Sequence, residues 1–297
     1  MIKCIDGRYR LTGLLGYPLK NSRSPRMHNI SFSALGLEYA YLAFEIEDGY
    51  LPGALEAMKS LHAQGFNVTM PHKQKVLQYL DEIDPAARMI GAVNTVYNDN
   101  GKLIGYNTDG KGFVKGLAEE GFDLAGKRVV LVGAGGAGRA VGVQVALSGI
   151  TDMTIFDVEL EKVTELLETI HENIKSVDAR GEVYSEAAVI EAVKNADLLI
   201  DCTPLGMDKI VVNAEGQEEN LIDKSTVNDP AVFRPDLFVA HIVYIPLETK
   251  LIKMAKEAGC RTMNGIPMMI WQGAEAFEIW TGHQMPVDVV KKDLFGE

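Results

Sequence analysis

The sequence has few cysteines, no long apolar run and little positive charge, and each shortage excludes a class of protein. Its three cysteines, Cys4, Cys202 and Cys260, lie far apart, so they provide neither a disulfide framework nor a paired zinc-ligand spacing. The longest apolar runs, such as residues 129–132, fall far short of the roughly 20 residues that cross a bilayer. No membrane-spanning segment is therefore expected.

Positive charge is scarce and dispersed. Lys and Arg number 29 against 41 Asp and Glu, which gives a formal net charge of −12, and no run of basic residues stands out. A nucleic acid is therefore not an expected partner, because nothing in the sequence would follow a phosphate backbone. The first six residues do not resemble a secretory signal, and a reducing cytoplasm is the expected location.

The pattern along the chain predicts two α/β domains. A length of 297 residues with 47% hydrophobic side chains suits two packed cores. In the first hundred residues, short apolar runs alternate with amphipathic stretches, which predicts β-α-β-α-β and a parallel sheet. Asn-Asp-Asn-Gly at 98–101 predicts a hairpin that closes this sheet. A second series begins at Lys127, and the apolar tail from Gly265 to Trp280 is expected to return to the first domain.

A glycine-rich turn opens the second series. It consists of Gly133, Ala134, Gly135, Gly136, Ala137 and Gly138, which contains G-x-G-x-x-G directly after an apolar strand and before a helix. Glycines at this spacing permit a tight turn and a close approach of the backbone to a pyrophosphate, which binds at the helix N-terminus. We predict a dinucleotide site, with a purely structural turn as the alternative.

An acidic residue follows at the distance expected for such a site. Asp157 ends the next strand, 24 residues beyond Gly133, where a carboxylate binds the adenosine ribose diol. Glu159 and Glu161 follow without an arginine between them, so a 2′-phosphate would be repelled and NAD is favoured over NADP. The alternative is that Asp157 caps the next helix.

Polar side chains gather in the first domain. Ser22 and Ser24, in Ser-Arg-Ser-Pro, can bind one carboxylate with two hydroxyls, although this sequence also suits a helix cap. Lys73 follows an apolar strand and a proline turn, and a lone lysine there is usually solvated. Asn94 and Asp109 stand at strand ends of the same domain, which is where ligands lie in open α/β sheets.

Taken together, these motifs resemble the shikimate dehydrogenase family. The matching segments are residues 22–25, 67–73, 91–95, 107–110, 133–138, 203–207, 243–249 and 268–277. Trp-Gln-Gly-Ala-Glu at 271–275, together with Asp157, is most similar to the NAD-dependent quinate/shikimate branch. The resemblance implies an N-terminal substrate-binding domain of residues 1–110, completed by residues 265–297, and a Rossmann-type NAD-binding domain of residues 111–264.

The resemblance also implies an activity and a set of site residues. The activity is hydride transfer between NAD and a ring hydroxyl of quinate or shikimate, with 3-dehydroquinate or 3-dehydroshikimate as the oxidised partner. Lys73 and Asp109 would be catalytic. The substrate would be bound by Ser22, Ser24, Tyr41, Thr69, Asn94, Tyr244 and Gln272. The nicotinamide side would be lined by Thr203, Met207, Gly265 and Met268.

Two positions depart from the family pattern, and two alternative functions remain. His241 stands where aspartate is common, and Ile245 stands where asparagine is usual. Neither His72 nor His241 has a second ligand at helical or turn spacing, so no metal is expected. The alternatives are an NADP-dependent shikimate dehydrogenase of aromatic amino acid biosynthesis and a non-catalytic NAD- or ligand-sensing protein. The sequence does not decide whether the protein forms a homodimer. It also does not decide whether quinate or shikimate is the preferred substrate.

Overall fold

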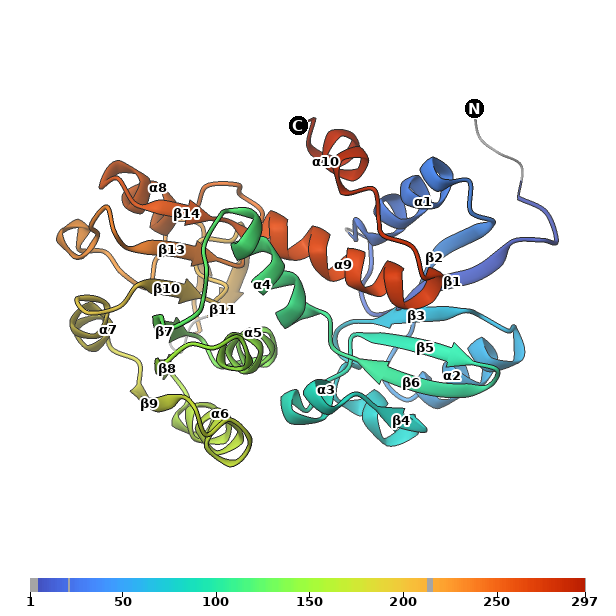
Figure 1. The fold of residues 1–297 in the computed structure, drawn as a ribbon, viewed down its shortest axis with the longest axis horizontal. Coiled ribbons are helices and arrows are strands. Elements are labelled where there is room, and N and C mark those ends of the chain that lie inside the picture. Colours follow the sequence, from blue (N-terminus) through green and yellow to red (C-terminus); the bar gives the residue numbers. More distant parts are fainter. Residues whose placement is uncertain (1–4, 21, 213–215, 297) are drawn as a thin grey trace. The chain divides into compact units, whose positions relative to one another are not determined.

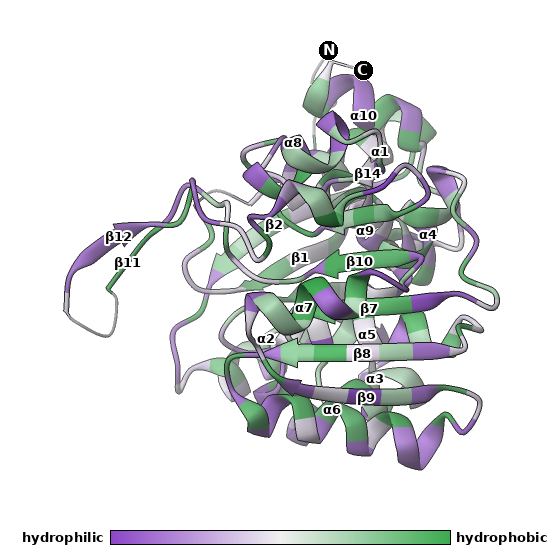
Figure 2. Ribbon diagram, turned by 90° about the vertical axis from the view of Figure 1, so that its left-hand side faces the viewer, coloured by the Kyte–Doolittle hydropathy of each residue, from purple (hydrophilic) through white to green (hydrophobic). Residues whose placement is uncertain are grey.

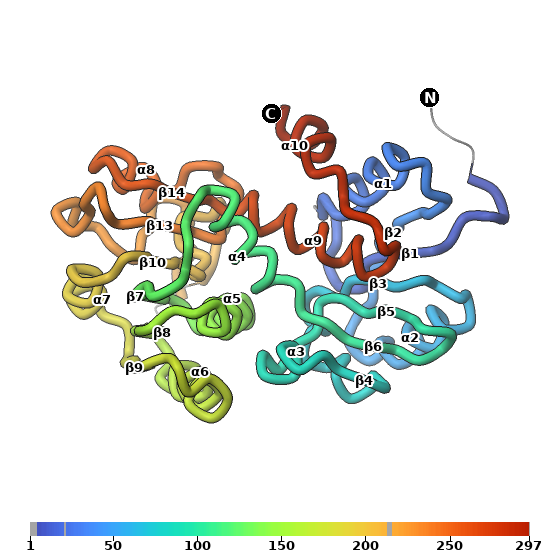
Figure 3. Tube along the Cα trace, viewed as in Figure 1, coloured from blue at the N-terminus to red at the C-terminus, as the bar shows by residue number. Residues whose placement is uncertain are grey.

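The computed structural model describes residues 5–20, 22–212 and 216–296, which fall into two compact units. Unit 1 consists of residues 1–112 and 270–297, and unit 2 of residues 113–269. The chain leaves unit 1 within helix α4 (Asp109–Glu119) and re-enters it within helix α9 (Gly265–Thr281), a path that the tube in Figure 3 follows.

Unit 1 is built on a mixed sheet with the strand order β2-β1-β3-β5-β6-β4. Its strands are β1 (Arg10–Gly16), β2 (Tyr39–Glu45), β3 (Gly65–Val68), β4 (Glu82–Ile83), β5 (Thr95–Asp99) and β6 (Lys102–Tyr106). Its helices are α1 (Ser24–Leu35), α2 (Leu51–Ser60), α3 (Pro85–Ile90), α10 (Val287–Phe295) and the short 3₁₀ helix η1 (Lys75–Tyr79). Strand β1 pairs in parallel with β2 and β3, whereas β5 is antiparallel to both β3 and β6.

The Asn-Gly sequence forms the predicted hairpin between β5 and β6. Asn100 and Gly101 have φ angles of 53° and 98°, the left-handed conformations that a tight hairpin turn requires. The Asn98 side chain accepts a hydrogen bond from the Gly101 N–H at 2.7 Å. The hairpin does not close the sheet, however, because β4 pairs with β6 and forms the edge.

The C-terminal part of α9 completes the core of unit 1. Trp280 is buried, and its indole N–H donates to the Val96 carbonyl at 3.0 Å. A side chain at Gly65 would overlap the Trp280 ring, so the absence of a Cβ there lets the ring lie against the strand. On the α2 side, Phe66 and Leu55 belong to an apolar cluster of fully buried side chains.

Unit 2 is built on a parallel sheet with the strand order β14-β13-β10-β7-β8-β9. Its strands are β7 (Arg128–Val132), β8 (Asp152–Asp157), β9 (Asp178–Val183), β10 (Leu198–Asp201), β13 (Phe238–His241) and β14 (Arg261–Met263). Its helices are α5 (Gly136–Leu147), α6 (Leu160–Asn173), α7 (Glu186–Val193) and α8 (Lys250–Glu257), as Figure 1 shows. A short 3₁₀ helix, η2 (Pro230–Val232), precedes β13. This strand order is doubly wound, with its switch point between β7 and β10.

A small hairpin of unit 2 was not predicted from the sequence. Strands β11 (Ile210–Val212) and β12 (Glu218–Asn220) form a separate antiparallel pair, which extends away from the parallel sheet in Figure 2. Two compact α/β units, one of them doubly wound, confirm the predicted fold class. Among the helices of the described residues, none combines the length and apolarity that a membrane span needs.

Candidate active site

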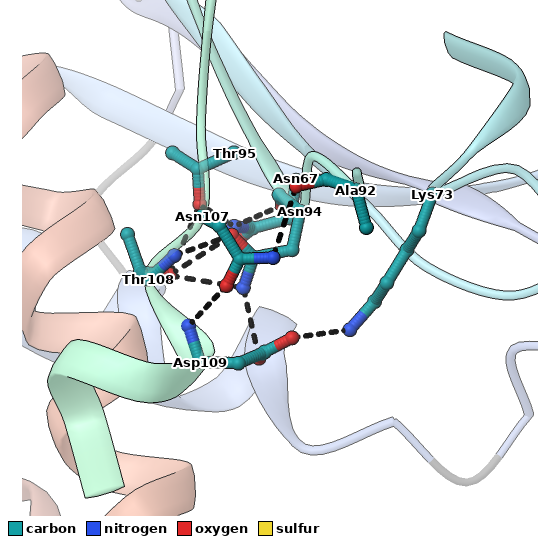
Figure 4. Close-up of polar contacts among 8 residues, drawn as sticks. All are labelled: Asn67, Lys73, Ala92, Asn94, Thr95, Asn107, Thr108 and Asp109. Carbon is teal, nitrogen blue, oxygen red and sulfur yellow. Dashed lines mark hydrogen bonds and ion pairs between the residues drawn. The ribbon is translucent and has the colours of Figure 1, made fainter. Parts of the chain in front are cut away.

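An ion pair stands at the centre of the polar groups of unit 1. Lys73 lies in the loop after β3, and Asp109 is the first residue of α4. The Lys73 ammonium donates to the Asp109 Oδ2 atom at 2.7 Å, and the two side chains are 31% and 12% exposed (Figure 4). The pair is therefore mostly shielded yet reachable, as a proton donor and acceptor for a bound hydroxyl must be.

Asn94 holds the carboxylate of this pair in place. Its amide nitrogen donates to Asp109 Oδ1 at 2.9 Å and to Thr108 Oγ1 at 3.0 Å, while its oxygen accepts from the Thr108 N–H at 2.8 Å. Asn107 adds a second constraint, because its side-chain oxygen accepts from the Asp109 N–H at 3.1 Å. Each Asp109 oxygen thus has a named partner, and in Figure 4 these side chains converge on the start of α4.

The hydrogen-bonded chain continues from Asn94 toward the predicted carboxylate site. Asn67, at the end of β3, donates to the Asn94 carbonyl at 3.0 Å and to Thr95 Oγ1 at 3.0 Å. The Tyr41 hydroxyl, from β2, donates to Asn67 Oδ1 at 2.8 Å. Burial raises the pKa of Tyr41 well above its usual value, and a hydrogen bond with the Ser24 side chain acts in the opposite direction.

One continuous chain therefore links Ser24, Tyr41, Asn67, Asn94 and Asp109 within unit 1. Asn67, Asn107 and Thr108 had no predicted role. All three lie in matched motifs, so the motifs held the signal, but only the fold shows which atoms meet.

The two predicted carboxylate-binding serines lie at the start of α1. Ser22 Oγ accepts from the Ser24 N–H at 3.3 Å, so one hydroxyl takes part in a local turn. Neither serine is the helix cap, because the N-cap residue of α1 is Arg23, without a side-chain capping hydrogen bond. Ser24 is the first residue of α1, and its neighbour Pro25 stands in the first helical turn. Thr69 is half-buried in the loop after β3, and Gln272 is half-buried on α9.

A buried histidine lies behind Tyr41. The His28 ring, on α1, stacks on the Tyr41 ring with centroids 4.5 Å apart, and the rings of Phe277 and Trp280 surround it. Neither ring nitrogen has a hydrogen-bond partner among the residues that the structure describes. Burial lowers the pKa of His28 to about 3, so the ring is neutral and packs as an aromatic side chain.

The glycine-rich turn of unit 2 connects β7 to α5 at the switch point of the sheet. Gly133 has a φ of 92°, and a Cβ on Gly138 would overlap the Gly133 carbonyl. Both positions therefore require glycine. A Cβ on Gly135 or Gly136 would meet nothing within 4 Å, so the space before the helix N-terminus is open to a ligand. These residues fit a pyrophosphate held by backbone N–H groups.

Asp157 lies beside this turn at the carboxyl end of β8. Its Oδ2 atom accepts from the Ala134 N–H at 2.7 Å, and its Oδ1 atom accepts from the Glu159 N–H at 3.0 Å. The second bond closes a local turn before α6, whose N-cap residue is Glu159, so Asp157 is not the cap of that helix. The first bond ties the carboxylate to the glycine-rich turn. A carboxylate has about four acceptor sites, so Asp157 retains capacity for ribose hydroxyls.

Two basic side chains, one on α5 and one on α6, were not considered in the sequence. Lys162 pairs with Glu159, whose carboxylate raises the pKa of Lys162. Arg139, on α5, donates to Thr169 Oγ1 at 2.8 Å and lies 3.5 Å from a Glu165 carboxylate oxygen. Each cation thus already has an acidic neighbour, which reduces its attraction for a phosphate.

The residues expected on the nicotinamide side lie on two segments of unit 2. Thr203 and Met207 belong to the loop after β10, where the Thr203 N–H donates to Asp201 Oδ1 at 2.8 Å. Gly265 begins α9, donates to the Val243 carbonyl at 2.9 Å and has no room for a Cβ against Ile242. Met268 is buried on α9.

Tyr244 follows β13 and is half-buried in unit 2, whereas the other predicted substrate residues belong to unit 1. Ile245, which departs from the family pattern, is 49% exposed in the same loop. Within the described residues, no cluster of three or more His, Cys, Asp and Glu side chains could hold a metal ion.

Comparisons with known proteins identify the family. A model described as the shikimate dehydrogenase substrate binding domain matches residues 14–96, and one described as the shikimate 5'-dehydrogenase C-terminal domain matches residues 265–295. The chain is 48% identical over 293 residues, 99% of both chains, to a shikimate dehydrogenase (NADP(+)) of Alkaliphilus metalliredigens. It is 40% identical over 291 residues, 97% of both chains, to a quinate/shikimate dehydrogenase of Escherichia coli.

A solved structure agrees with these relatives. Shikimate 5-dehydrogenase of Listeria monocytogenes, in complex with shikimate and NAD, has a TM-score of 0.90 and 36% identity, over 99% of each chain. Full-length similarity at this identity extends to both units. The chain therefore belongs to the shikimate dehydrogenase family of nicotinamide-dependent oxidoreductases.

Proposed function

We propose that this protein is an NAD-dependent dehydrogenase that interconverts a ring hydroxyl and a ring ketone on shikimate or quinate. The Lys73–Asp109 ion pair carries the proposal, because it joins a proton donor and an acceptor at 2.7 Å with partial access to solvent. Relatives named for shikimate or quinate, each similar over nearly the whole chain, support the same substrate class.

The reaction moves a hydride and a proton separately. NAD, when bound, accepts the hydride from the carbon that carries the reacting hydroxyl. In its neutral form, Lys73 takes the hydroxyl proton during oxidation and becomes an ammonium; during reduction, the ammonium gives a proton to the alkoxide. Asp109 orients the lysine amine and contributes negative charge beside it, while Asn94 keeps the Asp109 carboxylate aimed at Lys73. These residues make Lys73 the group that handles the proton.

The substrate carboxylate binds away from the reacting hydroxyl in this proposal. Ser22 and Ser24 supply two hydroxyl donors at the start of α1. Tyr41, buried beneath them, is hydrogen-bonded to both Ser24 and Asn67. The chain of hydrogen bonds from Ser24 to Asp109 fixes the two ends of the substrate site relative to each other, so a rigid ring carrying a carboxylate and hydroxyls is the ligand that it suits.

The preference for NAD rests on the charges around Asp157. Its carboxylate is fixed to the glycine-rich turn, where a 2′-phosphate would approach a negative charge at short range. Lys162 and Arg139 lie against the carboxylates of Glu159 and Glu165. The Listeria structure contains NAD, which supports this choice.

NADP is the competing cofactor. The relative from Alkaliphilus is named for NADP(+), and Lys162 could turn from Glu159 toward a phosphate. A cytoplasmic location and assembly as a homodimer remain predictions.

A matrix of steady-state rates tests the proposal. Shikimate and quinate are each oxidised with NAD and with NADP, and formation of the reduced cofactor is followed by its absorbance. We expect kcat/KM with NAD to exceed that with NADP at least tenfold for the better acid. Equal efficiency with both cofactors, or preference for NADP, would refute the cofactor assignment. Absence of any oxidation, with binding intact, would favour the non-catalytic sensor.

A further inference from the structure

A buried polar cluster lies at the carboxyl ends of β10 and β13 in unit 2. It consists of Asp201, Thr203, Thr226, His241 and Thr249. Asp201 is fully buried, and His241 is 1% exposed. A carboxylate and an imidazole removed from water in this way need partners inside the protein.

Each oxygen of the Asp201 carboxylate accepts one hydrogen bond. The Thr226 hydroxyl donates to Oδ2 at 2.6 Å, and the Thr203 N–H donates to Oδ1 at 2.8 Å. His241 Nε2 lies 3.9 Å from the same Oδ1 atom and 3.4 Å from the Thr203 carbonyl oxygen. Asp201 and His241 therefore contact the two backbone polar groups of Thr203, Asp201 at its N–H and His241 at its carbonyl, and so hold the two peptide units that flank this residue.

The other edge of the imidazole is anchored to helix α8. His241 Nδ1 lies 2.9 Å from Thr249 Oγ1, and Thr249 is the N-cap residue of that helix. A neutral ring that accepts from the Thr249 hydroxyl at Nδ1 carries its proton on Nε2, where it faces Thr203 and Asp201. This assignment follows from the pattern of hydrogen bonds.

The loop of residues 203–207 packs directly on these side chains. Gly206 has a φ of 88°, and a Cβ there would lie 2.9 Å from the Thr249 side chain and 3.5 Å from the His241 ring. The Gly206 N–H donates to the Leu221 carbonyl at 2.8 Å. The loop is thus held between the cluster beneath it and the segment that follows β12.

We propose that Asp201 and His241 act as a positioning pair that fixes the Thr203 peptide and, through it, the loop that faces the nicotinamide. The inference rests on the proposed function, in which Thr203 and Met207 line the nicotinamide side. It also accounts for the histidine at position 241. A carboxylate at this place would oppose the buried Asp201 carboxylate, whereas an imidazole N–H complements it.

Two variants separate the two edges of the imidazole. Gln at position 241 places an amide nitrogen near the Nε2 position, and Asn places one near Nδ1. His241→Asn should raise KM for NAD about tenfold, as expected for loss of one hydrogen bond to a charged or strongly polar group, and leave KM for shikimate within about twofold. His241→Gln should remain within about threefold of the unmodified enzyme in both constants.

Thermal unfolding and a titration with NADH fluorescence accompany the kinetics. The inference is supported if His241→Asn weakens cofactor binding while His241→Gln preserves it. It is overturned if both variants behave alike, or if the change falls on KM for shikimate. A preference of the unmodified enzyme for NADP would refute the cofactor proposal alone, because the same comparison with NADP still decides the role of His241. If no oxidation is detected, the NADH titration decides it.

A charge exchange keeps the inference testable if His241→Asn fails to fold. His241→Asp places two carboxylates together, so we expect a lower unfolding temperature, and adding Asp201→Asn should recover most of the loss because one carboxylate again faces an amide donor. Recovery in the double variant supports coupling between the two positions. A double variant no more stable than His241→Asp overturns it.

Discussion

The buried imidazole of His28 should make the stability of unit 1 depend on pH. Burial lowers the pKa of His28 from 6.5 to about 3, so the folded state resists a proton that the unfolded chain accepts. The neutral ring contributes its full stability above the unfolded pKa of 6.5, and this stability is lost as the pH falls from 6.5 toward 3. Within this range the unfolded state binds more protons, so stability rises with pH.

The size of the effect follows from these two pKa values. At pH 5, protonation of His28 stabilises the unfolded chain by RT ln(1 + 10^1.5), about 2 kcal/mol, and stabilises the folded state by almost nothing. At pH 8 both forms are neutral, and the difference vanishes. Titration of His28 should therefore lower the free energy of unfolding by about 2 kcal/mol when the pH falls from 8 to 5.

Urea unfolding followed by tryptophan fluorescence measures this loss. The chain has 2 tryptophans, Trp271 and Trp280, and both lie on the part of α9 that belongs to unit 1. His28→Phe is the matched control, because it keeps an aromatic ring in the stack against Tyr41 and removes the titrating group. Other groups titrate alike in both proteins, so the difference between the two pH dependences isolates His28. Equal losses of stability in the two proteins would refute the buried, neutral histidine.

Three further predictions concern the chemistry of the site. Lys73→Ala should lower kcat at least roughly 10²-fold with a smaller change in KM. Oxidation by the unmodified enzyme should become faster as the pH rises from 7 toward 10. Near-normal turnover of the variant with an unchanged pH profile would exclude Lys73 from proton transfer. Asp157→Ser should narrow the preference for NAD, measured as the ratio of kcat/KM values with the two cofactors, and an unchanged ratio would contradict its role. Ser22→Ala should raise KM for the acid by a few-fold to about a hundredfold, for one lost bond to a carboxylate, and a collapsed kcat at normal KM would show that the carboxylate binds elsewhere.

Local chemistry determined which parts of the fold could be predicted from the sequence. The strand before Gly133 is apolar throughout and is followed by glycines at fixed spacing, so the sequence was enough to predict a strand of a doubly wound sheet there. The hairpin at Asn100 and Gly101 could also be predicted, because few residues other than Asn and Gly adopt positive φ angles without strain. Strand β4 has two residues, and β11 and β12 have three each, too few for a period to show.

The contacts within the site depended on the tertiary fold. Asn94 was predicted to bind the substrate, and nothing in the sequence indicated that its amide also donates to Asp109 and Thr108. The pairing arises because the strand register brings the start of β5 beside the end of β6. Asp157 similarly reaches Ala134 only because β7 and β8 are neighbours. Such partners lie many residues apart, and no local pattern specifies them.

The return of the chain through α9 has a consequence for the order of events during synthesis. Unit 2 is a single continuous segment, whereas the core of unit 1 lacks Trp280 until α9, which follows unit 2 in the sequence, has been synthesised. At roughly 5–20 residues per second, strands β1 to β6 then wait on the order of 10–30 s for their closing helix. During that interval Gly65 and the Val96 carbonyl face water or a chaperone. A premature stop codon after Met269 would therefore leave unit 2 complete, whereas unit 1 would lack the helix that covers Gly65 and the Val96 carbonyl.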